Sequence, residues 1–217
     1  MSFFGEKKPA IYPTSGAINI SAFTGGGGGT TEIIDTASAH SLSAGDGVLI
    51  QGVTGATSSI NGSHKVLSVT DADTFVITHT IVGTPASGNI TKGIYFTNSK
   101  INYDFVEPDQ LNYRSVINGS RTNTHLGDYG TFKVTVFLWR AGTTALAKAL
   151  LTAIYAYYHT NVIFCPNQLP IKDSDSNLVY CYFKEMKPFY YKNLRAYDAV
   201  ELTFEINKYH DVSKLLL

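Results

Sequence analysis

The chain has 217 residues, enough for one large domain or two small ones, and 44% of them are hydrophobic, which is enough for a core. Its 17 Lys and Arg residues balance its 17 Asp and Glu residues, which argues against a specific nucleic-acid-binding protein that works through a broad basic field. Charged residues make up only 16% of the chain, against about 25% in typical soluble proteins. Two interpretations stay open: partners cover much of the surface, or the surface is that of a β-rich protein with exposed Ser, Thr, Asn and Gly.

Neither a membrane anchor nor a secretion signal is expected. No stretch approaches the roughly 18 uninterrupted apolar residues of a transmembrane helix. The first residues, Met-Ser-Phe-Phe-Gly-Glu-Lys-Lys, lack the apolar segment of a signal peptide. Cys165 and Cys181 lie in apolar runs, so we expect two buried thiols rather than a disulfide framework.

One part of the chain differs in composition from the rest. From residue 31 to residue 93 the only aromatic residue is Phe75, whereas the other 154 residues hold 26 aromatics. Five glycines, Gly25–Gly29, precede this part, and a composition shift with a flexible run at its edge is typical of an inserted folding unit. The chain then divides into a host domain, residues 1–29 and 94–217, and an inserted module, residues 30–93. We expect the host to stay folded when the module is deleted.

The module is predicted to be a small all-β barrel or sandwich. Five short strands are expected, at Thr30–Thr36, Val48–Ile50, His64–Val69, Thr74–Thr80 and Asn89–Phe96. Gly52–Ser59 is interpreted as a polar loop, and Asn61-Gly62 as a hairpin turn because both residues tolerate positive φ. The connections are too short for parallel crossovers, so the strands are expected to be antiparallel.

The host is predicted to be a β-sandwich or barrel flanked by one helix. Thr131–Trp139 alternates cleanly, and a helix is expected over about 143–158, capped by Thr143 or Thr144. One apolar stripe of that helix should pack on a sheet: Leu146, Ala149, Leu150, Ala153, Ile154 and Tyr157. Further strands are expected at Val162–Cys165, Leu178–Lys184, Met186–Tyr191 and Tyr197–Asn207. The fold class is therefore mainly β, with one helix and an inserted small β domain.

The sequence has no motif for an enzyme, a cofactor or a metal. Gly25–Gly29 lacks the Gly-Lys-Ser/Thr that completes a phosphate-binding loop. The run Asp173-Ser-Asp-Ser-Asn177 resembles the start of an EF-hand loop, but Leu178 and Lys184 replace the required Gly and Glu. His40, His64 and His79 are too widely spaced for a compact metal motif. We therefore expect no catalytic, cofactor-binding or metal-ligating residues.

The module resembles a small β domain of bacteriophage tail and other virion proteins. The resemblance is in the pattern His-x-Leu-x-x-Gly-Asp-x-Val-x-Ile from His40 to Ile50, followed by Asn61-Gly-x-His-x-Val66 and Thr74-Phe-x-Ile77. This domain is described as similar to the first catalytic-cysteine half-domain of ubiquitin-activating enzymes. The resemblance implies a structural or adhesive role rather than ubiquitin chemistry, since the module contains no cysteine.

The predicted order of host elements is similar to the fold of phage tail-tube, distal-tail and tail-terminator proteins. This resemblance implies a non-enzymatic virion protein, made in the cytoplasm of the host cell, which assembles with copies of itself. A hexameric ring in contact with other tail or baseplate proteins is the assembly that the family implies. Fold analogy does not by itself establish function.

Candidate contact residues lie in two segments. The segment Lys100–Tyr129 is rich in Asn, Tyr and Arg and lacks periodicity, so we interpret it as an inter-subunit arm. The residues expected at subunit contacts are Arg114 and Arg121 as ion-pair donors, with Tyr113, Tyr129, Tyr190 and Tyr191. The alternative is a carbohydrate-binding accessory protein that touches host glycans through the inserted module or a Tyr-rich surface that includes Tyr155, Tyr157 and Tyr158.

Overall fold

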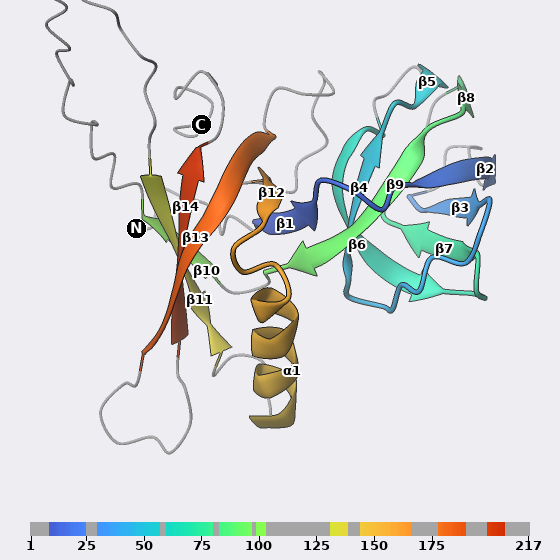
Figure 1. Cartoon of the computed structure of the whole chain (residues 1–217). Helices are drawn as coiled ribbons and strands as arrows, with labels where there is room; N and C mark the ends of the chain where they lie inside the picture. The colour runs from blue at the N-terminus through green and yellow to red at the C-terminus, as the bar shows by residue number, and fades with distance from the viewer. Residues whose placement is uncertain are drawn as a thin grey trace, which may run out of the picture.

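The computed structural model is mainly β with one α-helix (Figure 1), which confirms the predicted fold class. It describes residues 9–24, 30–56, 60–79, 83–96, 99–102, 131–138, 144–165, 178–189 and 199–206. The strands of the first half are β1 (Ala10–Pro13), β2 (Ile18–Thr24), β3 (Glu32–Thr36), β4 (Gly47–Gln51), β5 (Thr54–Ala56), β6 (Gly62–Val69), β7 (Thr74–Ile77), β8 (Gly83–Ala86) and β9 (Asn89–Tyr95). The remaining elements are β10 (Ser99–Asn102), β11 (Thr131–Phe137), α1 (Thr144–Tyr155), β12 (Asn161–Cys165), β13 (Val179–Phe189) and β14 (Ala199–Ile206).

Six strands form a closed barrel at one end of a twelve-stranded sheet. The order is β9-β2-β3-β7-β6-β4, and β4 pairs back with β9 to close it. The barrel core is aliphatic and contains Phe75 as its only aromatic residue of full burial. Ile18, Ile20 and Phe23 of β2 also pack on this core, although the sequence placed residues 18–24 in the host. The boundary between host and module stays a prediction, but β2 lies with the barrel strands.

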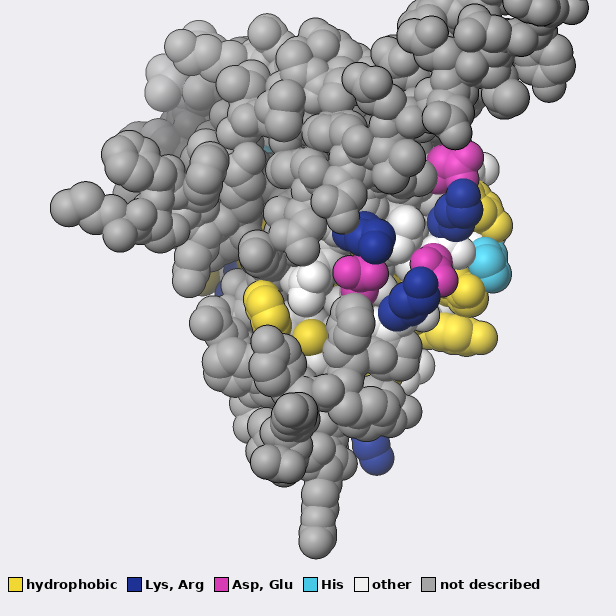
Figure 2. Space-filling model, turned by 90° about the vertical axis from the view of Figure 1, so that its left-hand side faces the viewer, with side chains coloured by type: hydrophobic (Ala, Val, Ile, Leu, Met, Phe, Trp, Pro, Cys, Tyr) yellow, Lys and Arg dark blue, Asp and Glu magenta, His cyan; other side chains and the backbone are white. Residues whose placement is uncertain are grey.

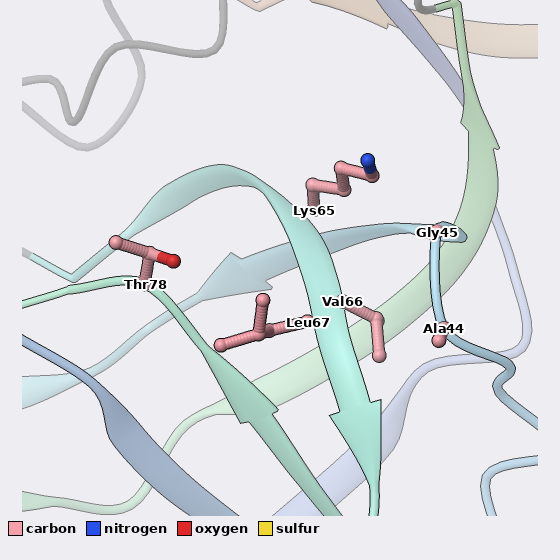
Figure 3. Close-up of a pocket in the computed structure, with 6 residues that line it drawn as sticks. All are labelled: Ala44, Gly45, Lys65, Val66, Leu67 and Thr78. Carbon is pink, nitrogen blue, oxygen red and sulfur yellow. The ribbon is translucent and has the colours of Figure 1, made fainter.

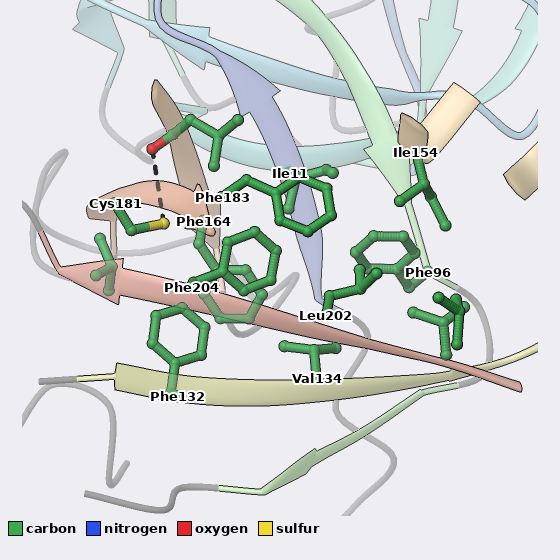
Figure 4. Close-up of a cluster of buried hydrophobic side chains, with 14 of the residues drawn as sticks. Ile11, Phe96, Phe132, Val134, Ile154, Phe164, Cys181, Phe183, Leu202 and Phe204 are labelled. Atoms are coloured by element: carbon green, nitrogen blue, oxygen red, sulfur yellow. Dashed lines mark hydrogen bonds between the residues drawn. The ribbon is translucent and has the colours of Figure 1, made fainter. Parts of the chain in front are cut away.

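The other end of the sheet has an aromatic core. Its order is β10-β11-β14-β13-β12-β1, and the alternating side chains of β11 and β14 point into the core. Phe132 stacks on Phe204, with ring centroids 5.2 Å apart, and lies 4.7 Å from Phe164 (Figure 4). Phe183 lies 4.9 Å from Phe204, so four rings fill the centre. Cys181 is buried beside them, and both Cys165 and Cys181 are free thiols, as predicted.

Helix α1 packs on this aromatic core with a face that only partly matches the predicted one. The side chains against the core are Ala147, Leu150, Leu151, Ile154, Tyr157 and Tyr158 of the helix and the turn after it. Leu150, Ile154 and Tyr157 of the predicted stripe are confirmed, whereas the prediction is wrong for Leu146, which is 56% exposed, and for Ala149, which is also exposed. The error has a physical cause: both sides of this helix are apolar, so hydrophobic periodicity does not fix which side is inward.

Two local predictions in the barrel are wrong. The expected polar loop at 52–59 contains β5, which pairs with β8. Asn61-Gly62 is not a hairpin turn, because the buried Asn61 side chain accepts a bond from Val53 N (2.9 Å) and donates to Val53 O (3.0 Å). Its amide thus occupies the place of a paired strand residue, which is a common use of Asn that the dipeptide pattern does not distinguish from a turn.

The strands expected at 178–184 and 186–191, the second being either an edge strand or a continuation of the first, form one continuous strand, β13 (Val179–Phe189), over the described residues. It pairs with β14 along its length, whereas β12 pairs only with residues 179–182. Pro188 therefore lies where β13 has a single partner, and a missing N–H is tolerated there. A bulge at residues 183–185 accommodates the change of register.

The two ends of the sheet meet where β1 crosses β9 and β4. Gly93 of β9 pairs with Gly47 of β4, and the ring of Tyr12 lies over both. A Cβ on Gly93 would overlap the carbonyl oxygen of Ile11 and the Tyr12 ring. The Tyr12 hydroxyl lies 2.5 Å from Ser63 Oγ on β6, and burial raises the pKa of Tyr12. The absence of a side chain at Gly93 is therefore required for the close approach of β1.

We predict that Gly93→Ala lowers the free energy of unfolding by about 3 kcal/mol, because the new methyl group displaces backbone as well as the Tyr12 ring. Gly16→Ala is the matched control: Gly16 has φ +84° but open space around it, so the cost should be about 1 kcal/mol. Urea denaturation of both variants measures the difference. Equal destabilisation of the two variants would show that the crossing is not tightly packed.

Candidate functional site

The sequence-predicted contact residues lie outside the residues that the structure describes. These are Arg114, Arg121, Tyr113, Tyr129, Tyr190 and Tyr191. Of the predicted arm, only the first residues are described: Lys100 lies in β10, opposite Thr135 of β11. Within the described part of the chain, β10 pairs with β11 alone and ends the sheet. The candidate surfaces therefore come from other residues.

The outward face of α1 is nearly free of charge. Its exposed positions are Ala145, Leu146, Lys148, Ala149, Thr152 and Tyr155, among which only Lys148 is ionisable at neutral pH. Tyr155 is 64% exposed, and the Thr152 hydroxyl is bonded to Lys148 O (3.0 Å) rather than offered to solvent. A helix on the surface of a soluble protein usually exposes charged residues to water, whereas a helix that is apolar on all sides is usually buried against other elements. The sequence already shows that residues 144–155 contain few charged side chains. The prediction of an inward apolar stripe did not use this feature, which indicates an uncharged outward face.

A column of aromatic rings extends from the end of α1 to β13. Tyr155 and Tyr158 lie 5.7 Å apart, and the Tyr158 ring lies 3.8 Å from that of His159. Tyr182 of β13 follows, with its hydroxyl 3.2 Å from His159 Nδ1. His159 lies in the turn after α1 with φ 59°, and its N–H donates to Phe183 O (3.0 Å), which connects this turn to β13. The column anchors the helix end to the sheet and exposes Tyr155.

The outward face of β11, β13 and β14 carries positively and negatively charged side chains next to one another (Figure 2). Three ion pairs lie on these strands: Lys133–Glu201 (3.3 Å), Lys184–Glu205 (3.1 Å) and Lys187–Glu185 (2.9 Å). All six side chains keep some exposure, so each pair adds little to stability. Equal numbers of both signs give no field that would attract a polyanion, and they suit a protein surface with mixed charges instead.

A groove on the outside of the barrel has a volume of about 460 Å³ (Figure 3). It is lined by Ala44, Gly45, Lys65, Val66, Leu67 and Thr78. Lys65 and Leu67 are exposed on the same side of β6, and Leu67 is 53% exposed. The sequence analysis missed this groove, although the i, i+2 spacing of an exposed Lys and an apolar residue on one strand was a signal for it.

The residues of the phage-module pattern have structural roles in the barrel. His40 Nδ1 accepts a bond from Leu42 N (3.0 Å), and the His40 ring meets Phe75 edge-on at 5.2 Å. Asp46 accepts a hydrogen bond from Ser43 N (2.8 Å) and forms an ion pair with Lys92 (2.9 Å). These two contacts fix the turn before β4. These contacts explain the pattern without a ligand.

Three ionisable groups lie inside or at the wall of the barrel. His64 is buried, its Nε2 lies 2.7 Å from Ile60 O, and its ring lies 5.5 Å from that of His79. Burial lowers the pKa of His64 to about 4, and burial also lowers the pKa of His79. Glu32 is buried, and that burial raises its pKa. All three shifts favour neutral side chains.

Neither a metal site nor a membrane helix is found in the described ranges. No three His, Cys, Asp or Glu side chains among these residues are placed to hold a metal ion. The helix in this part of the chain is too short to cross a bilayer. No protein-family model matches the chain, and no curated protein gives a significant match.

We predict that the barrel loses stability as the pH falls from about 6.5 to 4 because of His64. Its pKa is lower in the folded chain than in the unfolded chain, so the unfolded chain takes up the proton first and becomes favoured below pH 6.5. The displacement of this pKa to about 4 corresponds to roughly 3 kcal/mol.

Urea denaturation at several pH values, compared between wild type and His64→Gln, isolates this contribution. The glutamine amide can still donate to Ile60 O, and Glu32 and His79 titrate in both proteins. The variant should lose less stability than the wild type between pH 6.5 and 4. Parallel pH profiles would contradict the assignment to His64.

Proposed function

We propose that this protein is a non-enzymatic structural protein that assembles with copies of itself. The observation that carries the proposal is the outward face of α1, whose exposed positions include a single charged residue, Lys148. Exposure of the apolar side chains of this face to water is unfavourable. Covering the face with another subunit removes that free-energy cost. The formal net charge of zero adds no long-range repulsion between copies.

Two further features support assembly. The ion-paired face of β11, β13 and β14 presents both signs of charge, so it complements a surface of the same composition. The edge strand β10 has one strand partner within the described residues, and an edge strand is a place where another chain can add. Both features belong to the half of the molecule that also contains α1.

The setting we propose is a phage tail or baseplate, where the protein forms a ring, most simply a hexamer. The support is the resemblance of the module pattern at residues 40–77 to virion β modules, together with a mainly β fold with one helix. In this proposal the protein contacts other tail or baseplate proteins and resides in the virion. Tail tube, distal tail and terminator positions are all compatible with the proposal.

A carbohydrate-binding accessory protein is the second candidate. The observation that favours it is the groove on the barrel, which combines an ammonium group, a hydroxyl and an exposed leucine. Sugars present hydroxyls and apolar C–H faces, so binding sites for them need both kinds of group. The two candidates use different surfaces, and one protein could have both activities.

We predict that Ala149→Arg prevents assembly. The substitution places a long cation at the centre of the exposed face of α1, where it must be desolvated when a subunit covers the helix. Size-exclusion chromatography with light scattering, and negative-stain imaging, should show rings for the wild type and monomers for the variant. Thermal unfolding should show that the variant monomer is folded.

Ala72→Arg is the matched control, since Ala72 is exposed in a turn of the barrel. It should assemble like the wild type. A wild-type chain that stays monomeric at high concentration would refute self-assembly. Rings of Ala149→Arg would show that assembly uses a surface other than the α1 face.

A further inference from the structure

The groove on the barrel contains polar groups that the fold itself does not use. Among the described residues, the Lys65 ammonium has no ion-pair partner, whereas Lys92, Lys133, Lys184 and Lys187 each pair with a carboxylate. Its stem passes over Gly45, with Cε about 4.0 Å from the place of a Cβ there. The hydroxyl of Thr78, on the segment after β7, has no hydrogen-bond partner within the described part of the chain, and Thr78 lines the same groove (Figure 3).

Leu67 lines this groove at an irregularity of β6. The register between β6 and β7 shifts between Val66 and Ser68, so Leu67 lies at a bulge. Bulges commonly redirect a side chain next to a binding site. Leu67 is one of three large hydrophobic side chains with more than half of their surface exposed in the described chain, and the other two are on α1. Its exposure is not required for the barrel core, since Val66 supplies the inward side chain.

The groove is not built to take an added strand. β6 pairs with β4 through residues 62–65 and with β7 through residues 66–69. The backbone of Val66 is also bonded to Gly45 N and Asp46 O in the adjacent turn, at 2.8 and 2.9 Å. The backbone of Val66 is therefore engaged on both sides, so recognition at this point of the groove uses side chains. A volume of about 460 Å³ suits a ligand of one or two rings.

We propose that this groove binds a saccharide that has a carboxylate group. The Lys65 ammonium pairs with the carboxylate, and the Thr78 hydroxyl exchanges hydrogen bonds with a sugar hydroxyl. Leu67 contacts the apolar C–H face of the sugar ring. The proposal rests on the second candidate function, carbohydrate binding, and is independent of ring assembly. The proposal gives the barrel a ligand, whereas the residues of the module pattern at 40–77 that are described above have structural roles only.

The test uses the full-length protein with three probes: glucuronate, methyl glucoside as a neutral sugar, and acetate as a simple anion. Saturation-transfer NMR and isothermal titration calorimetry should detect glucuronate at millimolar concentration and the other two much more weakly. Lys65→Met should weaken glucuronate binding about fivefold, the effect of one partly exposed ion pair. Leu67→Ser should also weaken it. Lys148→Met, at a lysine of α1 that likewise has no ion pair with a described residue, should have no effect.

Each outcome bears on a different claim. Equal binding of methyl glucoside would overturn the acidic-sugar assignment and leave carbohydrate binding standing. Equal binding of acetate would reduce the site to an anion site and overturn the saccharide assignment. No binding of either sugar would overturn both this proposal and the second candidate function. Equal losses in Lys65→Met and Lys148→Met would place the binding outside the groove. Thermal unfolding of each variant checks its fold, and light scattering reads assembly separately.

Discussion

The approach of Tyr12 to Gly93 is the contact on which the rest of the structure depends. Tyr12 is fully buried, its ring lies over two paired glycines of β9 and β4, and its hydroxyl reaches Ser63 on β6. Around it lies a small third core, formed by Ala10, Tyr12, Leu49, Tyr95, Ile163, Cys165 and Leu178. Leu49 belongs to this core, while its neighbours Val48 and Ile50 face the inside of the barrel. The strand β4 is thus covered on both faces, which explains its continuous apolar sequence.

This arrangement places two kinds of surface on one sheet. The half that contains α1 presents an uncharged helix face and a neutral, ion-paired strand face, which we propose for assembly. The barrel presents a groove with Lys65 and Leu67, which we propose for an acidic sugar. In the ring that we propose, contacts of the half that contains α1 would position the barrel. The aromatic column at His159 fixes the end of the helix relative to β13 and so positions the face that we propose for assembly.

The sequence predicted those elements whose side chains alternate strictly. The strands around Phe132 and Phe204 and the pairing of Phe75 with the aliphatic barrel core follow from period-two patterns. It failed where two physical solutions fit the same residues. The helix α1 has apolar residues on both sides, so either side could pack on the core. Asn61 fits a turn, but its side chain can also pair with the backbone of Val53 as a strand residue would. The apolar residues of β2 could pack on either core. The exposure of Lys65 and Leu67 follows the i, i+2 alternation of β6, whereas no local pattern specifies the bulge between residues 66 and 68 beside the groove.

The sequence also predicted that the host folds without the inserted module, and this stays a prediction. The structure shows what such a deletion removes: β9 pairs with β1 as well as with β4, so the two cores share strands. We conclude that the Tyr12 crossing joins them into one cooperative unit. Native-state hydrogen exchange tests this most directly. Our account predicts that amides of Ile11 and Ile94 at the crossing exchange as slowly as the slowest amides of both cores, with one limiting free energy. Rapid exchange at the crossing, with separate limiting free energies for the barrel and for β11–β14, would contradict it.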